Sequence, residues 1–435
     1  MKKLLIACPL LLSSAVLFAE GYQVNMMSTK QSGMGHVGVA MKLGAESMHF
    51  NPAGMGFMDN SLDISVGVSA IHAEARYHNP ETDIRAHTHN TFSTPLYAYV
   101  GFSIYDNLKA GISLTTPYGS SNDWGQNWVG ATMVQKISME SFCYQPTLSW
   151  KILDNLSVGA GLMMAYGTVD LSKSLLMGRD LPSASLGDNI SVMGIKLHGK
   201  SNMAVGYNVG VLWDINPQWS VGASYRSKVH LKVKHGSAKL DYVNDQIKTV
   251  IEKLIPALPK LEEATFASQL PLPANLTIGA NYKPTDRWQV SLEAQMVGWK
   301  AYDMLEVTFN ESDVQAFNQQ LVKNYKQAIA VRLGAQYALT ERLDLRGGIY
   351  FDQSPVRKEY YNPETASMNK IGTSIGCSFR PVKGLSVNFA LLYIAGLHRD
   401  GSYTVKSISG KESTFSGHYS SFAIAPSLGV SYTFH

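Results

Sequence analysis

Tight turns and long polar segments alternate along most of the chain, and this alternation restricts the fold more than any other feature. Six short turn signals lie between strand-like runs, at 106–107, 154–155, 216–217, 284–286, 340–341 and 383–384. Longer polar segments separate them, at about 76–95, 118–135, 171–200, 235–269, 300–324, 353–367 and 398–418. The pattern predicts fourteen strands joined by six short turns and seven long loops. Short turns at one end and long loops at the other are typical of bacterial outer-membrane barrels.

The strand-like runs alternate apolar and polar residues. In 62–70, Leu62, Ile64 and Val66 share one face, while Asp63 and Ser65 share the other. The runs 156–166 and 422–434 alternate in the same way. Side chains of a strand point to opposite faces in turn, so this period suits a strand with one face in lipid. The sequence therefore predicts an all-β, fourteen-stranded antiparallel transmembrane β-barrel over 61–435.

The N-terminus predicts export. Lys2 and Lys3 precede a short apolar run over 4–18, and Ala19 follows at a plausible cleavage point, so 1–19 is interpreted as a signal peptide. Beyond it no run of eighteen apolar residues occurs, and no membrane-spanning helix is expected. The chain is only 16% charged and contains 37 Gly and 22 Tyr. Because only helices and closed barrels satisfy the backbone in lipid, an outer-membrane barrel is expected.

Aromatic residues and the C-terminus add to this expectation. Trp150, Trp213, Trp219 and Trp288 all lie within a few residues of the short turns, which suits the membrane–water boundary. The final run, 427–434, resembles the insertion signal that barrel-assembly machinery recognises in a last strand. Outer-membrane lipid and that machinery are therefore expected partners.

Residues 20–60 do not alternate and are rich in Gly and Ala. They could form a loose periplasmic tail. A lumen enclosed by fourteen strands is too wide for its own side chains to fill, so we predict instead that 20–60 is a hatch that plugs it. The run 33–38 fits G-x-G-x-x-G, but no strand precedes it, and a nucleotide site is not expected.

Other functional classes find little support in the sequence. No catalytic set or nucleophile elbow appears, so the protein is not expected to be an enzyme or to need a cofactor. The net charge of +4 indicates no nucleic-acid partner. Cys143 and Cys377 do not make a disulfide framework. Four histidines around the first outer loop are interpreted as solvated rather than as metal or haem ligands, namely His72, His78, His87 and His89.

Strand parity places several charges on the lumen side of the wall. The predicted inward-facing cations are Arg226, Lys228, Arg332 and Arg346, and the same parity points Glu293 and Asp352 inward. A carboxylate that leaves water needs a cationic partner, so these four cations are candidate head-group contacts. The alternative is that the charges pair with each other or with the hatch.

The long segment 235–269 contains an apolar stripe at helical spacing, which includes Ile247, Ile251, Leu254 and Ile255. An apolar helix on an outer loop suits the capture of an acyl chain. The alternative is that the stripe packs against neighbouring loops.

Several motifs, in their order along some 400 residues, resemble the FadL/TodX family of outer-membrane long-chain fatty-acid and hydrocarbon transporters. They include Gly21-Tyr22-Gln23-Val24-Asn25, Asn51-Pro52-Ala53-Gly54-Met55, Thr116-Pro117-Tyr118-Gly119 and Arg346-Gly347-Gly348-Ile349-Tyr350. The resemblance implies a hatch inside a fourteen-strand barrel, capture on outer loops, a lumen pocket, and release sideways through a gap in the wall. It places Asn51, Pro52 and Ala53 in the hatch, and Tyr22 near the inner pocket.

The function expected from this resemblance is passive uptake of long-chain fatty acids or similar hydrophobic compounds by a monomer. Two alternatives stay open. One is uptake of another hydrophobic ligand, such as aromatic hydrocarbons or haem. The other is a structural or adhesive barrel.

Overall fold

A computed structural model describes residues 21–180, 187–406 and 412–434. The expected signal peptide lies outside these described residues. Within them, no helix is long and apolar enough to cross a membrane.

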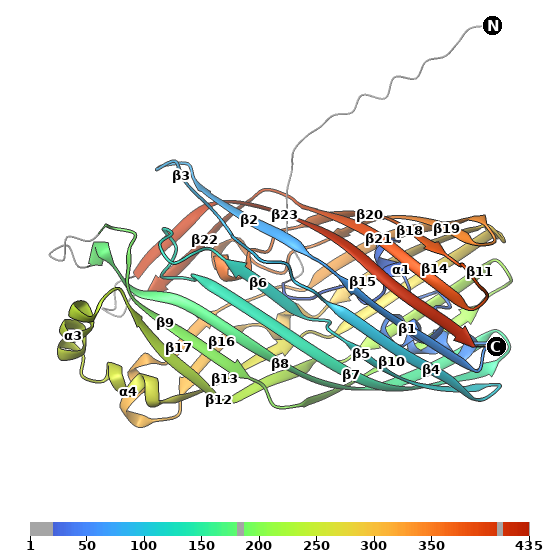
Figure 1. Cartoon of the computed structure of the whole chain (residues 1–435), viewed down its shortest axis with the longest axis horizontal. Coiled ribbons are helices and arrows are strands. Elements are labelled where there is room, and N and C mark those ends of the chain that lie inside the picture. The colour runs from blue at the N-terminus through green and yellow to red at the C-terminus, as the bar shows by residue number, and fades with distance from the viewer. Residues whose placement is uncertain (1–20, 181–186, 407–411, 435) are drawn as a thin grey trace, which may run out of the picture.

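Fourteen strands form a closed antiparallel ring (Figure 1). In order around the ring they are β1 (Leu62–Ser69), β4 (Leu96–Tyr105), β5 (Leu108–Thr115), β7 (Lys136–Leu153), β8 (Leu156–Met177), β10 (Ala204–Asp214), β11 (Trp219–Arg226), β14 (Asn275–Thr285), β15 (Trp288–Val297), β18 (Ala328–Thr340), β19 (Leu343–Asp352), β20 (Lys370–Phe379), β21 (Leu385–Gly396) and β23 (Glu412–Phe434). The ring closes where β1 pairs with β23, with Leu62 opposite Phe434. The predicted fold class is confirmed.

The predicted short turns join consecutive ring strands at one end of the barrel. Two-residue turns at 106–107, 154–155, 286–287 and 341–342 connect their strands directly. Both ends of the ring, Leu62 and Phe434, lie at this same end, near the C-terminus marked in Figure 1. Short turns face the periplasm in bacterial barrels, so this is the periplasmic end. The four tryptophans beside these turns are exposed, as a membrane boundary requires.

The opposite, outer end carries more regular structure than the sequence indicated. Additional strands extend the wall there: β2 (His72–Asn79), β3 (Ile84–His87), β6 (Gly119–Asp123), β9 (Ser191–Lys200), β12 (Val229–Tyr242), β13 (Thr265–Leu272), β16 (Met304–Phe309), β17 (Gln319–Val322) and β22 (Arg399–Lys406). The expectation that 171–200 is a polar loop is wrong, because β8 continues to Met177 and pairs with β9, with Thr168 opposite Lys200.

Short helices complete the outer end. Among the residues that the structure describes, the α-helices there are α3 (Asp245–Leu254) and α4 (Leu258–Glu263), at the far left of Figure 1. The 3₁₀ turns are η3 (Gly178–Asp180), η5 (Trp299–Ala301), η6 (Ser312–Phe317), η7 (Lys358–Tyr360) and η8 (Pro363–Thr365).

Residues 21–60, for which we keep the name hatch, are largely buried against the inner side of the wall. Their helical turns are α1 (Thr29–Ser32), η1 (Gly44–Glu46), α2 (Ser47–Phe50) and η2 (Pro52–Phe57). Where this segment touches the wall, the wall residue is often glycine. A Cβ atom added at Gly222 would lie 2.1 Å from the carbonyl oxygen of Val39. One added at Gly159 would lie 2.4 Å from the carbonyl carbon of Pro52. These glycines let the segment approach the strand backbones closely.

Candidate functional site: a cavity at a break in the wall

The third strand of the ring is interrupted. β5 ends at Thr115 and β6 begins only at Gly119. On the other side β4 begins at Leu96, and the preceding segment turns away to pair with Ile71 through Ser93. Among the described residues, no backbone hydrogen bond joins 91–95 to 116–121. We call this break the seam, with 91–95 on one side and 116–121 on the other.

The first described residues of the chain lie along the inner side of the seam. The Val24 N–H donates to the Pro117 carbonyl at 2.9 Å, and the Gly119 N–H donates to the Tyr22 carbonyl at 2.9 Å. The segment therefore supplies the interrupted strand with the backbone partners that β4 does not provide. Moving this segment would change the seam directly.

A cavity of about 410 Å³ occupies the seam. Its lumen end is lined by buried residues that include Met26, Tyr350 and Leu392. Its other end reaches Phe92, which is 64% exposed on the outside of the wall. The cavity thus extends from the lumen to the outer surface, and we call it the seam cavity.

Tyr22 holds the segment in place at the inner side of the seam. Its ring meets Trp299 edge-on, with centroids 4.8 Å apart, and meets Tyr302 edge-on at 5.8 Å. Its hydroxyl donates to the carbonyl of Pro271. Edge-to-face contacts between buried rings are favourable, and the polar tip is satisfied. Tyr22 therefore ties the start of the hatch to the inner wall.

Asn51 makes a second tie, farther along the hatch. Its side-chain oxygen accepts from the Ala53 N–H at 3.1 Å and so caps η2, where Pro52 is the first residue. Its Nδ2 donates to the carbonyls of Val39, at 2.7 Å, and Val211, at 2.9 Å. Val39 belongs to the hatch and Val211 to β10, so one buried amide connects both.

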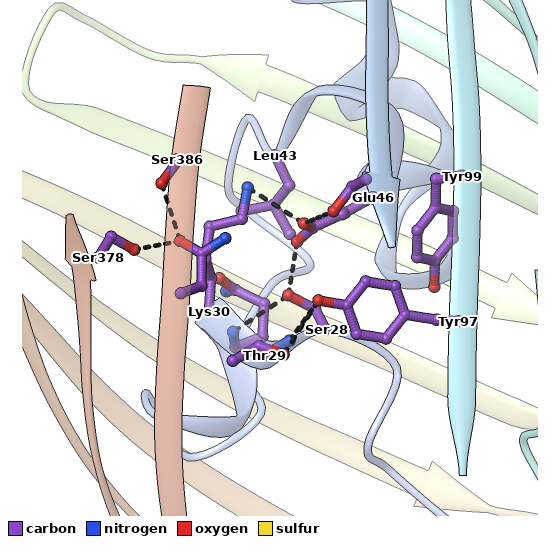
Figure 2. Close-up of polar contacts among 12 residues, drawn as sticks. Ser28, Thr29, Lys30, Leu43, Glu46, Tyr97, Tyr99, Ser378 and Ser386 are labelled. Carbon is purple, nitrogen blue, oxygen red and sulfur yellow. Dashed lines mark hydrogen bonds and ion pairs between the residues drawn. The ribbon is translucent and has the colours of Figure 1, made fainter. Parts of the chain in front are cut away.

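Glu46 forms a third tie, shown in Figure 2. This carboxylate is fully buried. It accepts from the hydroxyls of Ser28 in the hatch and Ser65 in β1, and it pairs with Lys30 at 3.1 Å. Nearby, the Tyr97 hydroxyl of β4 donates to Thr29 Oγ1 at 3.0 Å. The bonds to the Glu46 carboxylate are charge-assisted and are therefore stronger than neutral hydrogen bonds.

Glu293 of β15 forms a fourth tie from the wall side. Its carboxylate accepts from the backbone N–H groups of Gly38 and Val39. The predicted inward orientation of this side chain matches its burial. The hatch is therefore held at four separate places around the ring.

Three of the four predicted lumen cations are buried and bind protein groups. Arg226 donates to the carbonyl of His49 at 2.8 Å and to its ring nitrogen at 3.2 Å. Burial, and then the Arg226 charge, lower the pKa of His49, which suits a neutral imidazole that accepts this bond. Arg332 donates to Gln295 at 2.7 Å, and Arg346 donates to Gln336 at 2.7 Å. Arg226 therefore bonds to the hatch, whereas Arg332 and Arg346 bond to glutamines of the wall.

The prediction for Lys228 is wrong. The strand parity changes after β11, because Ser227 leaves the strand and its hydroxyl accepts from the Tyr207 N–H at 2.8 Å. Val229 and Leu231 are then buried, whereas Lys228 is exposed on the opposite face. Lys228 therefore does not contribute to the lumen.

A small second cavity, of about 50 Å³, adjoins the seam cavity. Both cavities are lined by His36 and Tyr118. The second is also lined by Arg226, Arg332 and Glu293. Cationic side chains consequently lie close to the inner end of the seam cavity.

The outer-loop stripe forms helix α3, which Asn244 caps by accepting from the Ile247 N–H at 2.8 Å. Ile251 is 3% exposed and belongs to an apolar cluster with Val192 and Met193, against which Ile247 and Ile255 also pack. The side chain of Leu254 lies outside the described residues. Val250, by contrast, is 54% exposed. The stripe thus packs on neighbouring strands, and Val250 presents the apolar surface of α3 to the outside.

The remaining candidate groups are the histidines, the acidic side chains and the two cysteines. Nowhere in the described ranges do His, Cys, Asp and Glu side chains gather in a group that could hold a metal ion. Cys143 and Cys377 are both free thiols.

Comparisons with known proteins agree with this architecture. A putative outer membrane protein of Neisseria meningitidis is 24% identical, over 95% of this chain and 93% of its own. A protein of Escherichia coli named long-chain fatty acid transport protein is 20% identical, over 90% of each chain.

Solved structures show the same fold. A FadL homologue of Pseudomonas aeruginosa superposes with a TM-score of 0.80 at 20% identity, covering 96% of this chain and all of the other. The toluene transporter TodX of Pseudomonas putida gives 0.70 at 15% identity, covering 97% of this chain and all of the other. Residues 10–434 match a family described as outer membrane protein transport protein (OMPP1/FadL/TodX). The chain, an outer-membrane barrel and a transport protein rather than an enzyme, therefore belongs to the OMPP1/FadL/TodX family.

Proposed function

We propose that the protein mediates passive uptake of long-chain fatty acids or similar hydrophobic compounds across the outer membrane. In this proposal the compound reaches the seam cavity from the outer loops and leaves sideways through the seam into the lipid. The observation that carries it is the seam cavity itself, which extends from buried lumen residues to exposed Phe92. Its volume of about 410 Å³ lies within the usual range of small-molecule pockets.

The charges near the cavity favour an amphiphile with an acidic head. Arg226 and Arg332 line the small cavity that adjoins the inner end of the seam cavity. A carboxylate drawn out of water is stabilised by a cation and by hydrogen-bond donors. The E. coli relative named for long-chain fatty acid transport supports the same substrate class.

The hatch supplies a gate for this route. Residues 22–24 bond to 117–119 on the inner side of the seam, and the rest of the segment is tied to the wall through Asn51, Glu46 and Glu293. These three ties lie away from the seam, so a local shift of 21–27 that breaks the Tyr22 contacts would widen the exit without releasing the rest of the hatch. The same segment blocks the lumen against small solutes.

Capture on the outer loops begins at α3 in this proposal. Val250 presents exposed apolar surface, whereas Ile251 anchors the helix. Val250→Ser should therefore weaken capture at low ligand concentration and leave the loop folded. Ile251→Ser should disturb the loop itself, which limited proteolysis would detect. Equal uptake by wild type and Val250→Ser would remove the capture step.

Aromatic hydrocarbons are a second candidate, and one observation favours them. Aromatic side chains cluster beside the inner end of the seam cavity, namely Tyr22, Tyr118, Trp299, Tyr302 and Tyr325. Edge-on and offset contacts with such rings stabilise an aromatic ligand. Structural neighbours that carry this fold include a toluene transporter.

Blocking the seam tests the route. Ser93→Trp combined with Ser120→Trp places two indoles in the seam cavity, and Ser172→Trp on the outward side of β8 is the matched control. Uptake of labelled palmitate by cells that depend on this protein should fall for the blocked variant and persist for the control. Normal uptake by a blocked variant that still shows heat-modifiable migration would refute lateral release. A binding panel of fatty acids, aromatics and haem would then identify the substrate class.

A further inference from the structure

Five lysines on the outside of the outer wall lie on two adjacent strands. They are Lys200 of β9, Lys228 just before β12, and Lys232, Lys234 and Lys239 of β12. All five are exposed. Val229, Leu231 and Val233 alternate with them and are buried in the interior clusters, so these lysines point away from the lumen. We call the five the lysine patch.

The backbone pairing brings the lysine patch together. Ser201 bridges Val233, and the Asn202 N–H donates to the Lys232 carbonyl at 3.0 Å. Because the two segments are antiparallel, Lys200, one residue before Ser201, lies opposite Lys234, one residue after Val233. Cross-strand neighbours on one face lie about 5 Å apart at Cβ.

The charges of the lysine patch are not neutralised by ion pairs. In the described part of the chain, none of the five lysines forms an ion pair, whereas neighbouring Lys196 pairs with Asp241 at 2.9 Å. Like charges on adjacent strands destabilise a sheet. Between them, burial and then the charges of Lys228 and Lys232 lower the pKa of His230. An anion from outside the chain would relieve this repulsion.

The position of the lysine patch relative to the membrane indicates which kind of anion it binds. On β8 the outward face is apolar up to Tyr166 and becomes polar at Thr168. At the outer end of β10, Val205 and the preceding Met203 are exposed and reach the same level, since Ala204 pairs with Ala165. Lys200 lies opposite Thr168, where the outward face of β8 becomes polar. The patch therefore begins just above the hydrocarbon edge, at the outer end of the barrel.

We propose that the lysine patch binds the phosphate groups of the glycolipid that forms the outer leaflet. Lysine stems can lie along the apolar edge while their ammonium groups reach head-group phosphates. Basic residues beside a bilayer attract anionic lipid heads in this way. Tyr166 stacks with Phe142 at 5.5 Å directly below and offers a flat apolar surface for the acyl chains of the same lipid.

The test compares two charge-matched variants of the full-length protein in detergent. The patch variant is Lys200→Gln, Lys232→Gln and Lys234→Gln. The control variant removes three exposed cations at the periplasmic turns, by Arg287→Gln, Arg342→Gln and Lys383→Gln. Heat-modifiable migration verifies that both are folded. Binding is measured with lipid A, with enzymatically dephosphorylated lipid A, and with inorganic pyrophosphate.

Lipid A should bind wild type and the control variant alike. It should bind the patch variant on the order of 100-fold more weakly, given the usual contribution of each lysine near an anionic surface. Dephosphorylated lipid A should bind all three proteins weakly. Equal lipid A affinity of patch and control variants would overturn the proposal, as would equal binding of the dephosphorylated form. Pyrophosphate binding as tight as that of lipid A would show a soluble anion site instead of a lipid site.

Discussion

Replacing Asn51 by Ala should loosen the hatch without unfolding the barrel. The substitution removes three buried hydrogen bonds, to Val39, Val211 and Ala53. A typical buried hydrogen bond contributes about 1 kcal/mol net, so the hatch loses about 3 kcal/mol. Since about 1.4 kcal/mol corresponds to a factor of ten, the open hatch becomes about 100-fold more populated. The wall keeps its own ladder of backbone bonds, and the thermal unfolding of the barrel should change little.

Two measurements check this. Hydrogen exchange of backbone amides over 21–60 should accelerate, and brief ion-conducting openings should become frequent in a planar bilayer. The matched control is Ser291→Ala, which removes a buried hydrogen bond to Asn281, at 2.8 Å, within the wall alone. It should change neither measurement. If folded Asn51→Ala showed wild-type exchange and conductance, the amide would not hold the hatch, and the gating argument would fail.

Three further outcomes are expected. Glu293→Ala removes the acceptor of two hatch N–H groups, so amide exchange near 38–39 should rise, whereas Glu293→Gln should retain most of the protection. Glu364→Leu leaves the buried Lys323 ammonium without its carboxylate partner at 3.0 Å. The outer loops should lose about 3–5 kcal/mol of stability, measured by limited proteolysis. Adding Lys323→Met should restore most of that stability. His230 should titrate by NMR below its ordinary pKa. Protonation then opposes the fold, so any stability this residue contributes is present above about pH 6.5 and declines as the pH falls; a raised pKa would contradict the lysine crowding.

The barrel could be predicted because its signals are local. A two-residue turn such as Asp154-Asn155, between two alternating runs, identifies a hairpin without knowledge of the rest of the chain. Strand parity likewise placed Glu293, Arg332 and Arg346 on the inner side, where they are buried. Parity depends only on the count of residues within one unbroken strand.

The partners of these side chains depend on contacts that the sequence does not encode locally. Arg226 bonds to His49, which is 177 positions away and lies on the hatch. Lys228 was misplaced because parity fails at a break, and the break at Ser227 depends on its contact with Tyr207 of another strand. The seam combines both difficulties, since the interruption after Thr115 matters only because β4 begins late and residues 22–24 lie alongside.

The glycines of the inner wall have a consequence for assembly. Gly159, Gly222 and Gly334 leave hollows that fit the backbone at Pro52, Val39 and Met34. The hatch fits these hollows most simply if it is in place before the wall closes around it. The ring closes between β1, made first, and β23, made last. We therefore expect the hatch to be in place while the strands curve. The ring then forms around the hatch before β1 and β23 pair.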